Sequence, residues 1–374
     1  MRILGLDIGG ANVKASTADG ECLSIPFPIW QKKEGLREVL SQLPYFRQLA
    51  PQIVAVTMTA ELADCFISKA DGVAFVINTV VEAFPNSLIR IWLTSGEFAE
   101  PLDASELPEL AGASNWHALA TWAGRAIPTG PALVIDIGST TTDIIPLVDG
   151  CPVPEGRTDL ERLAASELLY TGIHRTPVCA IVRSVPLINE EGSGVPVFIP
   201  VAAEVFATAL DVHLLNGDIP PNEKEMETAD GRPATRTASF NRLAHMLCCD
   251  ASELSEVQLL AIAAHVADQQ LEQICEAIRN RVCYLEGLTS SLTGIKTQIV
   301  LSGSGTWMSE RAIRRIGEDR FGAISNLVEM FVRNVTASAP AFAVARLAAE
   351  RCLDDLLPCL QQSAATPNPT RTVE

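Results

Sequence analysis

Two stretches of the chain, Leu4–Gly20 (LGLDIGGANVKASTADG) and Leu133–Gly150 (LVIDIGSTTTDIIPLVDG), repeat one pattern. Each has an apolar run ending in Asp-Ile-Gly, a turn of small residues, a second strand-like run and a closing Asp-Gly. Because Asp-Gly favours hairpin turns, both stretches are predicted to form a strand, a glycine turn and a strand. The two aspartates, Asp7 and Asp136, lie about 130 residues apart, which is the size of one domain. A duplication at this period predicts two similar α/β domains.

The length and composition are those of a globular protein. The chain has 374 residues, of which 48% are hydrophobic and 20% charged, and this excludes a disordered or collagen-like chain. The net charge of −17 disfavours nucleic acids and anionic membrane surfaces as partners. Every apolar stretch is too short to cross a bilayer, and Asp7 interrupts the first one, so a signal peptide is not expected.

The ten cysteines are scattered, and none of them forms a CxxC pair. A zinc site needs paired ligands at defined spacing, so this pattern argues against one. In a chain of this length, scattered cysteines are typical of small buried side chains in a reducing compartment rather than of a disulfide framework. We therefore expect a cytoplasmic protein that binds neither nucleic acid nor membrane.

Hydrophobic spacing and breaker residues predict the elements between and after the two copies. The breaker-rich segment Ala126–Pro131 (AIPTGP) suggests a first domain at 1–130 and a second at 131–337 with helical insertions. We expect the tail at 361–374 to be disordered. Helices are predicted at Glu61–Lys69, Asn115–Arg125, Asp159–Tyr170, Val201–Leu210, Ser239–Met246, Glu253–His265, Ala267–Gly287 and Ala341–Cys352. Strands are predicted at Ile53–Thr57, Val73–Ile77, Leu88–Leu93 and Gln298–Leu301.

A strand that ends in Asp and continues into Gly and small polar residues is suited to binding phosphate. Glycine lets backbone N–H groups approach phosphate oxygens, hydroxyls add donors, and the carboxylate would hold Mg²⁺ or its water shell. The first such segment contains Asp7, Gly9, Gly10, Asn12 and Lys14, and the second contains Asp136, Gly138, Ser139, Thr140, Thr141 and Asp143. Each pattern alone is also typical of an ordinary turn, and it is the repetition that favours a phosphate site.

A third glycine-rich turn, Ser302–Gly305 (SGSG), follows the predicted strand at Gln298–Leu301. It contributes Gly303, Ser304 and Gly305 as further candidates for contact with a phosphate-bearing ligand. Because the Lys-Ser/Thr pair of a P-loop is missing, the turn does not support a Walker-type NTPase. An ordinary loop is the alternative interpretation.

Together the three turns resemble the phosphate-1, phosphate-2 and adenosine motifs of the actin, sugar-kinase and Hsp70 superfamily. Within it, Thr158–Val178 (TDLERLAASELLYTGIHRTPV) resembles the hydantoinase A/oxoprolinase branch. Four shorter segments are similar to a one-subunit family linked to tetrahydromethanopterin-dependent one-carbon metabolism and methanofuran biosynthesis: Val56–Asp64, Asn115–Ala118, Thr228–Arg232 and Leu301–Trp307. The resemblance extends from Arg2 to about Cys352.

The resemblance implies a fold and a reaction. The fold would be two ribonuclease-H-like domains of the actin and hexokinase type around a central cleft, with a C-terminal helix at about 338–360 completing the first domain. The reaction would be condensation of a furfuryl diphosphate with the phenol of γ-glutamyltyramine, with release of pyrophosphate. Mg²⁺ would be the cofactor. An ATP-dependent kinase, an amide-ring hydrolase and a non-enzymatic nucleotide sensor stay open, as do bound ATP or ADP and a homodimer.

Several residues receive roles from position and resemblance. Asp7, Asp136 and Glu61 are the candidate catalytic groups, and Asp7, Asp136 and Asp143 the candidate metal ligands. Glu61 follows a predicted buried strand and would be the general base or a second metal ligand, although a carboxylate at a helix start is the alternative. Lys14 would contact a phosphate or be a solvated strand lysine. The remaining candidates for binding the diphosphate or its acceptor are Gly9, Gly10, Asn12, Thr59, Gly138, Ser139, Thr140, Thr141, Arg175, Gly303, Ser304 and Gly305; Arg175 is chosen because guanidinium recognises phosphate bidentately.

Overall fold

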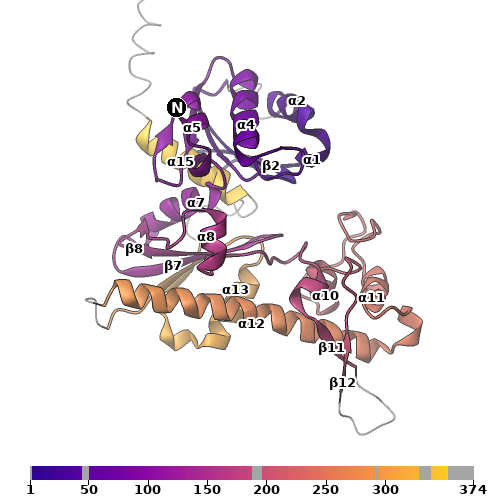
Figure 1. Ribbon diagram of the computed structural model, residues 1–374. Helices are drawn as coiled ribbons and strands as arrows, with labels where there is room; N and C mark the ends of the chain where they lie inside the picture. The colour runs from indigo at the N-terminus through magenta and orange to yellow at the C-terminus, as the bar shows by residue number, and fades with distance from the viewer. Residues whose placement is uncertain (1, 44–49, 188–195, 291–293, 328–337, 353–374) are drawn as a thin grey trace, which may run out of the picture. The chain divides into compact units, whose positions relative to one another are not determined.

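The computed structural model divides the chain into two compact units (Figure 1). One comprises the residues up to Ala126 together with the C-terminal residues from Phe331 onward, and the other comprises Ile127–Met330. The predicted disordered tail lies outside the residues that the structure describes. The described residues are 2–43, 50–187, 196–290, 294–327 and 338–352.

The first unit is built on a mixed six-stranded sheet with the order β3-β2-β1-β4-β5-β6. Strand β1 pairs antiparallel with β2 and parallel with β4, and β4 pairs parallel with β5. Its strands are β1 (Ile3–Ile8), β2 (Asn12–Thr17), β3 (Cys22–Pro26), β4 (Ile53–Met58), β5 (Leu88–Trp92) and β6 (Phe98–Ala99). Its helices are α1 (Ile29–Lys32), α2 (Leu36–Ser41), α4 (Lys69–Ala83), α5 (Pro101–Glu106), α6 (Pro108–Ala111), α7 (Asn115–Ala123) and α15 (Ala339–Arg351), with short 3₁₀ turns η1 (Lys33–Gly35) and η2 (Gly124–Ala126).

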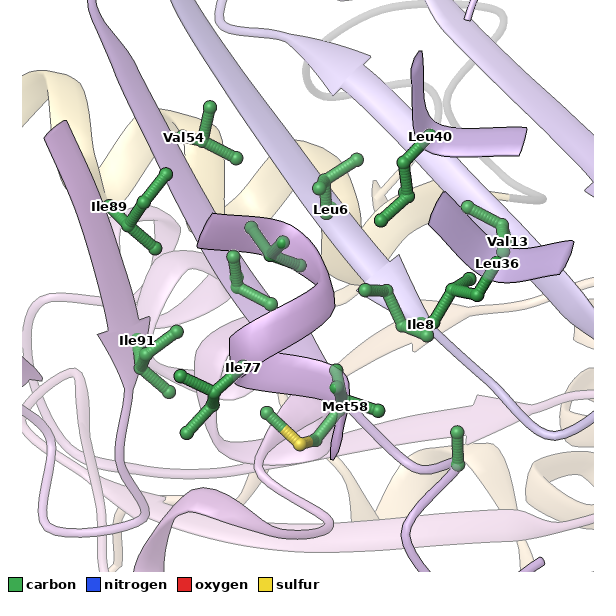
Figure 2. Close-up of a cluster of buried hydrophobic side chains, with 14 of the residues drawn as sticks. Leu6, Ile8, Val13, Leu36, Leu40, Val54, Met58, Ile77, Ile89 and Ile91 are labelled. Carbon is green, nitrogen blue, oxygen red and sulfur yellow. The ribbon is translucent and has the colours of Figure 1, made fainter. Parts of the chain in front are cut away.

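One face of this sheet carries the main hydrophobic core of the unit (Figure 2). Successive residues of a strand point to opposite faces, so Leu6 and Ile8 share one face of β1. They lie with Leu36 and Leu40 of α2 and Ile77 of α4, all of them buried. Asp7 therefore projects from the opposite face of the same strand.

The opposite face is covered by helices with small residues. A Cβ added at Gly5 would lie 2.0 Å from the backbone oxygen of Ala341 and 2.8 Å from the Cβ of Ala345. Helix α15 thus packs directly on β1, and it also packs on α7. This close approach requires glycine in the strand and alanine in the helix.

The second unit has a mixed sheet with the order β10-β8-β7-β13-β14, and β9 pairs with β8. Here β7 pairs antiparallel with β8 and parallel with β13, as β1 does with β2 and β4. Its strands are β7 (Pro131–Ile137), β8 (Thr142–Val148), β9 (Cys151–Pro152), β10 (Leu168–Leu169), β13 (Gln298–Ser302) and β14 (Ile324–Asn326), with a separate pair formed by β11 (Ser184–Leu187) and β12 (Val197–Pro200). Its helices are α8 (Asp159–Ala164), α9 (Val178–Ile181), α10 (Ala209–Leu215), α11 (Arg236–His245), α12 (Glu256–Leu288) and α13 (Thr306–Ile316), with 3₁₀ turns η3 (Ala251–Glu253) and η4 (Glu318–Arg320).

Helix α12 organises the second unit. It is 33 residues long and begins with a capping box formed by Ser255 and Gln258. One part packs on β8 and α13, and another part packs on α10, α11 and β11 (Figure 1). None of the described helices is both long and apolar enough to span a membrane.

The predicted fold class is confirmed: both units are α/β and built on mixed sheets with the same pairing at the centre. The predicted cleft concerns the arrangement of the two units and stays a prediction.

Two predicted elements of the first unit are wrong. Residues 61–68 form turns and bends rather than a helix. Helix α4 begins at Lys69, where Ser68 accepts a hydrogen bond from the backbone N–H of Asp71. The predicted strand Val73–Ile77 lies inside this helix. Its valines and isoleucine suggested a strand, but the buried positions Val73, Val76, Ile77 and Val80 follow helical spacing.

The second unit corrects three more boundaries. The helix expected at Val201–Leu210 begins only at Ala209, after the capping residue Thr208. The two helices expected between Glu253 and Gly287 are the single helix α12. The helix expected at Asp159–Tyr170 ends at Ala164, because Ser166 has a positive φ of 59° and the chain then enters β10.

Candidate functional site

The end of β1 places Asp7 in a buried position beside one cation. Asp7 and Lys14 are opposite each other in the β1–β2 pair, and the Lys14 Nζ lies 3.5 Å from the Asp7 Oδ2. Asp7 is only 2% exposed. Its Oδ1 is buried and has no hydrogen-bond partner among the described residues. Such an atom is rare in folded proteins, and a bound water or ion is one way to satisfy it.

Burial raises the pKa of Asp7, and the nearby Lys14 opposes that shift. The charged carboxylate is therefore under-compensated in the protein alone. A hard cation such as Mg²⁺ prefers carboxylate oxygens, so the unpartnered Oδ1 of Asp7 has the chemistry to bind it or one of its waters.

The glycine turn that follows β1 lies beside the end of β4. The Gly9 N–H donates to the Asn12 carbonyl at 2.9 Å, and the Thr59 N–H donates to the Ile8 carbonyl at 2.9 Å. A Cβ at Gly9 would lie 3.4 Å from the Thr59 Oγ1, whereas one at Gly10 would meet no described atom within 4 Å. The predicted residues of this turn are thus together, with open space over Gly10.

Glu61 follows β4 in a turn and is 1% exposed. Glu61 is not itself the first residue of a helix, since α4 begins at Lys69, whose Nζ lies 4.0 Å from the Glu61 Oε1. A Cβ at Gly112 would lie 3.1 Å from the Glu61 Cγ, so the side chain packs against this glycine. Glu61 is a buried acid at the same end of the sheet as Thr59.

A pair of buried hydroxyl groups lies near Asp7. Thr57 is the register neighbour of Asp7 in the parallel β1–β4 pair, and its Oγ1 lies 2.9 Å from the Ser114 Oγ. In-register neighbours point to the same face of a sheet, so this pair belongs to the polar environment of Asp7. Sequence reasoning missed Ser114, which directly precedes the Asn115–Ala118 motif, and that motif was the available signal.

In the second unit, Asp136 and Asp143 are opposite each other in the β7–β8 pair. Asp143 is buried, and its Oδ1 accepts a 2.7 Å bond from the Nη2 of the buried Arg162. Burial raises the pKa of Asp143, and Arg162 opposes the shift. One oxygen of this candidate metal ligand is therefore engaged by an arginine. No three His, Cys, Asp or Glu side chains gather as a metal-ligand group in the described part of the chain.

The turn Gly138–Thr141 is held by the family-like segment Gly172–Arg175. Within the turn, the Gly138 N–H donates to the Thr141 carbonyl at 2.9 Å. The N–H groups of His174 and Arg175 donate to the Ser139 carbonyl at 3.0 and 2.9 Å. A Cβ at Gly172 would lie 2.6 Å from the Gly138 oxygen. The two segments therefore stack backbone against backbone.

The third turn, Ser302–Gly305, also packs against the end of β7. The Gly305 N–H donates to the Ile137 carbonyl at 2.9 Å. Gly303 has a φ of +85°, and a Cβ there would lie 2.2 Å from the Ile137 oxygen and 2.9 Å from the Asp136 Oδ1. Glycine is thus required for this turn to approach Asp136. Three segments far apart in sequence converge at the end of β7.

Arg175 lies at the border of this group, 40% exposed, with its Nε 3.7 Å from the Glu227 Oε1. Glu227 precedes the Thr228–Arg232 motif, which is anchored because Asp230 accepts a 2.9 Å bond from the buried Arg242. Sequence reasoning left Glu227 and Arg242 without a role. The structure shows that the motif holds an acid against Arg175.

The chain belongs to the hydantoinase/oxoprolinase family, whose model matches residues 52–351. It is 31% identical over 348 residues to the (4-{4-[2-(γ-L-glutamylamino)ethyl]phenoxymethyl}furan-2-yl)methanamine synthase of Methanocaldococcus jannaschii, covering 92% of this chain and 97% of that one. It is 30% identical over 215 residues to the Methanococcus vannielii protein of the same name, covering 58% and 89%. The family resemblance is thereby confirmed.

Two solved structures are also similar. One is acetone carboxylase in a nucleotide-free state, with a TM-score of 0.45, 12% identity, and coverage of 92% of this chain and 70% of that one. The other is an archaeal actin homologue in complex with ADP, with a TM-score of 0.41, 15% identity, and coverage of 94% and 100%.

Proposed function

We propose that this chain is a transferase that forms an aryl ether in the biosynthesis of methanofuran or a methanofuran-like one-carbon carrier. The observation that carries the proposal is the 31% identity over 97% of the Methanocaldococcus jannaschii synthase. The product in that protein's name contains a phenoxymethylfuran unit, in which a phenol oxygen is joined to a methylene carbon on the furan ring. The reaction that we propose makes this bond, and we assign it to the cytoplasm.

The substrates would be an aminomethylfuran-methyl diphosphate and γ-glutamyltyramine. The bond between the methylene carbon and the diphosphate oxygen breaks, and its electron pair leaves with pyrophosphate. The phenol oxygen forms the new C–O bond and gives its proton to a base. The furan ring spreads the positive charge that develops on the methylene carbon, so charge on the leaving group is what the protein has to stabilise.

The turn at the end of β7 is suited to the diphosphate. Ser139, Thr140 and Thr141 offer hydroxyl donors, and the glycine backbone leaves room for phosphate oxygens. The Gly172–Arg175 segment fixes the turn through the Ser139 carbonyl. Arg175 is exposed enough to exchange its Glu227 contact for a phosphate. Lys14 would be the cation that the first unit supplies, and Ser302–Gly305 would contact the rest of the ligand.

Asp7 in the first unit and Asp136 in the second are the residues that we assign as Mg²⁺ ligands, each acting directly or through the ion's waters, and Asp143 would act through its second oxygen. The fit rests on the unpartnered Oδ1 of Asp7. Mg²⁺ is commonly held by one or two carboxylates plus waters and substrate phosphates, which agrees with the sparse set of acids here. When bound, the ion supplies charge neutralisation for the diphosphate.

Glu61 is the group that we assign to receive the phenol proton. It is buried, and it lies at the end of β4 where side chains of α/β sheets meet their ligands. A carboxylate that is shielded from water is a stronger base than a solvated one. Lys69, 4.0 Å away, would stabilise its charged form before the transfer.

The direct test incubates the full chain with both substrates and Mg²⁺, without nucleotide, and measures product by mass spectrometry and pyrophosphate by a coupled assay. We expect one ether and one pyrophosphate per turnover, and loss of both with EDTA. An ATP arm distinguishes the alternatives. ATP consumption without ether would contradict the proposal and favour a kinase or an amide-ring hydrolase.

A further inference from the structure

A network of buried polar side chains is hydrogen-bonded to the backbone at the start of the Gly172–Arg175 segment. Gln270 of α12 is 0% exposed. Its Nε2 donates to the Thr171 Oγ1 at 2.8 Å and to the Gly172 carbonyl at 2.9 Å. Its Oε1 lies 2.9 Å from the Nε2 of His213, which is 1% exposed. The other ring nitrogen of His213, Nδ1, lies 3.2 Å from the Asp218 Oδ2.

The donor or acceptor character of each group determines where the protons lie in this hydrogen-bonded network of side chains. The Gly172 carbonyl can only accept, so the NH₂ group of Gln270 must face it. The Gln270 Oε1 then faces His213 and needs a donor, which requires a proton on the His213 Nε2. Asp218 as a carboxylate also only accepts, which requires a proton on Nδ1. An imidazole that donates from both nitrogens is the cationic form.

The charged groups around His213 support that form. Asp218 also accepts a 2.6 Å bond from Arg311 of α13. Burial acts to raise the pKa of Asp218, but the hydrogen bonds from His213 and Arg311 bring it below its ordinary value, so Asp218 is ionised. The Trp307 ring covers His213 at a centroid distance of 5.0 Å. The pKa of the nearby His174 is lowered, chiefly because that side chain is buried.

We propose that His213 is a positioning residue for the turn Gly138–Thr141. His213 is held as an imidazolium between Asp218 and Gln270, and it fixes the orientation of the Gln270 amide. Gln270 in turn fixes the Gly172–Arg175 segment, which supports the turn. The inference rests on the proposed function for its kinetic consequence. Its structural basis is independent, because the Gln270 contact and the His174 and Arg175 contacts lie on one short piece of backbone. Side chains that do not contact a ligand themselves, such as His213 and Gln270 here, commonly orient the residues that do.

The variant Gln270→Glu separates positioning from stability. The carboxylate keeps its acceptor toward His213 and adds an opposite charge, but it cannot donate to the Gly172 carbonyl. We expect kcat/KM for the furfuryl diphosphate to fall about 10- to 100-fold while KM for γ-glutamyltyramine stays unchanged. The matched control is Gln273→Glu, since Gln273 lies one turn along α12 and donates to the Ile181 carbonyl at 3.2 Å, away from the turn.

Equal kinetics in the wild type and Gln270→Glu, or equal losses in the two glutamate variants, would overturn the positioning role. A measurement without catalysis uses Mg²⁺ and inorganic pyrophosphate, whose affinity should fall in Gln270→Glu and not in Gln273→Glu. If the proposed function is wrong, the wild type forms no ether but this binding difference persists.

The imidazolium is tested by NMR of ¹⁵N-histidine-labelled protein, in which His213 is assigned by its loss in His213→Asn. The chain has five histidines, so the spectrum is small. We expect protons on both His213 ring nitrogens at neutral pH. A neutral tautomer would overturn the proposed state.

Discussion

Asp7 shows how a single residue connects stability with the proposed chemistry. It is buried, its Oδ1 lacks a hydrogen-bond partner among the described residues, and Lys14 at 3.5 Å is 31% exposed. Leaving a buried acceptor unsatisfied costs stability, about 1–3 kcal/mol in ordinary cases. Such a cost is typical of binding sites, where groups are arranged for a ligand rather than for the empty protein.

Replacing Asp7 by Asn should therefore stabilise the ligand-free protein and abolish turnover. The folded-state pKa of Asp7 is raised, so the wild-type residue favours folding at acidic pH and this contribution is lost as pH rises through the raised pKa. We expect the variant to gain about 1 kcal/mol at neutral pH, and the gain to shrink below about pH 4, where Asp7 is protonated in both states.

Denaturant unfolding of both proteins in EDTA, across pH, measures this difference. A less stable Asp7→Asn protein at neutral pH would show that the carboxylate is a structural group. Added Mg²⁺ should stabilise only the wild type.

Arg175 carries a second prediction at this scale. Arg175→Ala should lower kcat/KM for the diphosphate. The loss should correspond to about 1–3 kcal/mol of transition-state stabilisation, the range for losing a charge-assisted hydrogen bond. Stability should change little, because the side chain is 40% exposed. Glu227→Gln is the paired control: it removes the competing carboxylate and should leave kcat/KM unchanged or raised. Similar losses in both variants would indicate that the ion pair itself matters.

At the scale of elements, backbone contacts between glycine segments form the best-defined part of the site. A Cβ at Gly172 would lie 2.6 Å from the Gly138 oxygen, the Ser139 carbon and the Thr140 nitrogen, all of them backbone atoms that cannot move independently. The turn Gly138–Thr141 and the Gly172 segment therefore form one rigid piece.

Gly172→Ala should displace the turn and reduce both activity and stability, the latter by about 1–3 kcal/mol, as overpacking does. The control is Gly287→Ala near the end of α12, where the new Cβ would meet no described atom within 4 Å. Alanine is the better helix former by about 1 kcal/mol, so this variant should be at least as stable as the wild type. Thermal unfolding and turnover of the two proteins decide the matter, and an active, stable Gly172→Ala protein would refute the contact.

The sequence predicts elements well where local chemistry decides them. Both Asp-Gly hairpins, the strand at Gln298–Leu301 and the helix at Ala341–Cys352 are present. It failed at α4, where β-branched residues imitate a strand, because helical spacing and the Ser68 cap carried the true signal. The sequence did not predict contacts between residues that are far apart along the chain. Gln270 contacts Thr171 and Gly172 across nearly a hundred residues, and no local pattern encodes that pairing.

At the scale of the whole molecule, the duplication is preserved in pairing and altered in chemistry. Asp7 lies between Lys14 and Thr57 in its sheet, and Asp136 lies between Asp143 and Ser302. The first copy supplies a cation opposite its aspartate. The second supplies an acid that Arg162 binds. The repeated sequence predicted the shared frame, but only the structure shows this difference.

The charge of the chain makes local donors essential. The net charge is −17, and the proposed diphosphate carries about three negative charges, so the overall field opposes binding. Backbone N–H groups, Lys14, Arg175 and Mg²⁺ would have to overcome it over a short range, where contact interactions exceed the screened field of distant acids. If the diphosphate is the leaving group, the bond between the furan methylene carbon and the diphosphate oxygen must break.

The most direct test labels the oxygen that bridges the furan methylene and the diphosphate with ¹⁸O. After turnover with γ-glutamyltyramine and Mg²⁺, the ether and the pyrophosphate are separated, and the ¹⁸O content of each is measured by mass spectrometry. We predict that all of the label leaves in pyrophosphate and that the ether carries the unlabelled phenol oxygen. Label retained on the furan methylene, or a phosphorylated phenol in place of the ether, would contradict it.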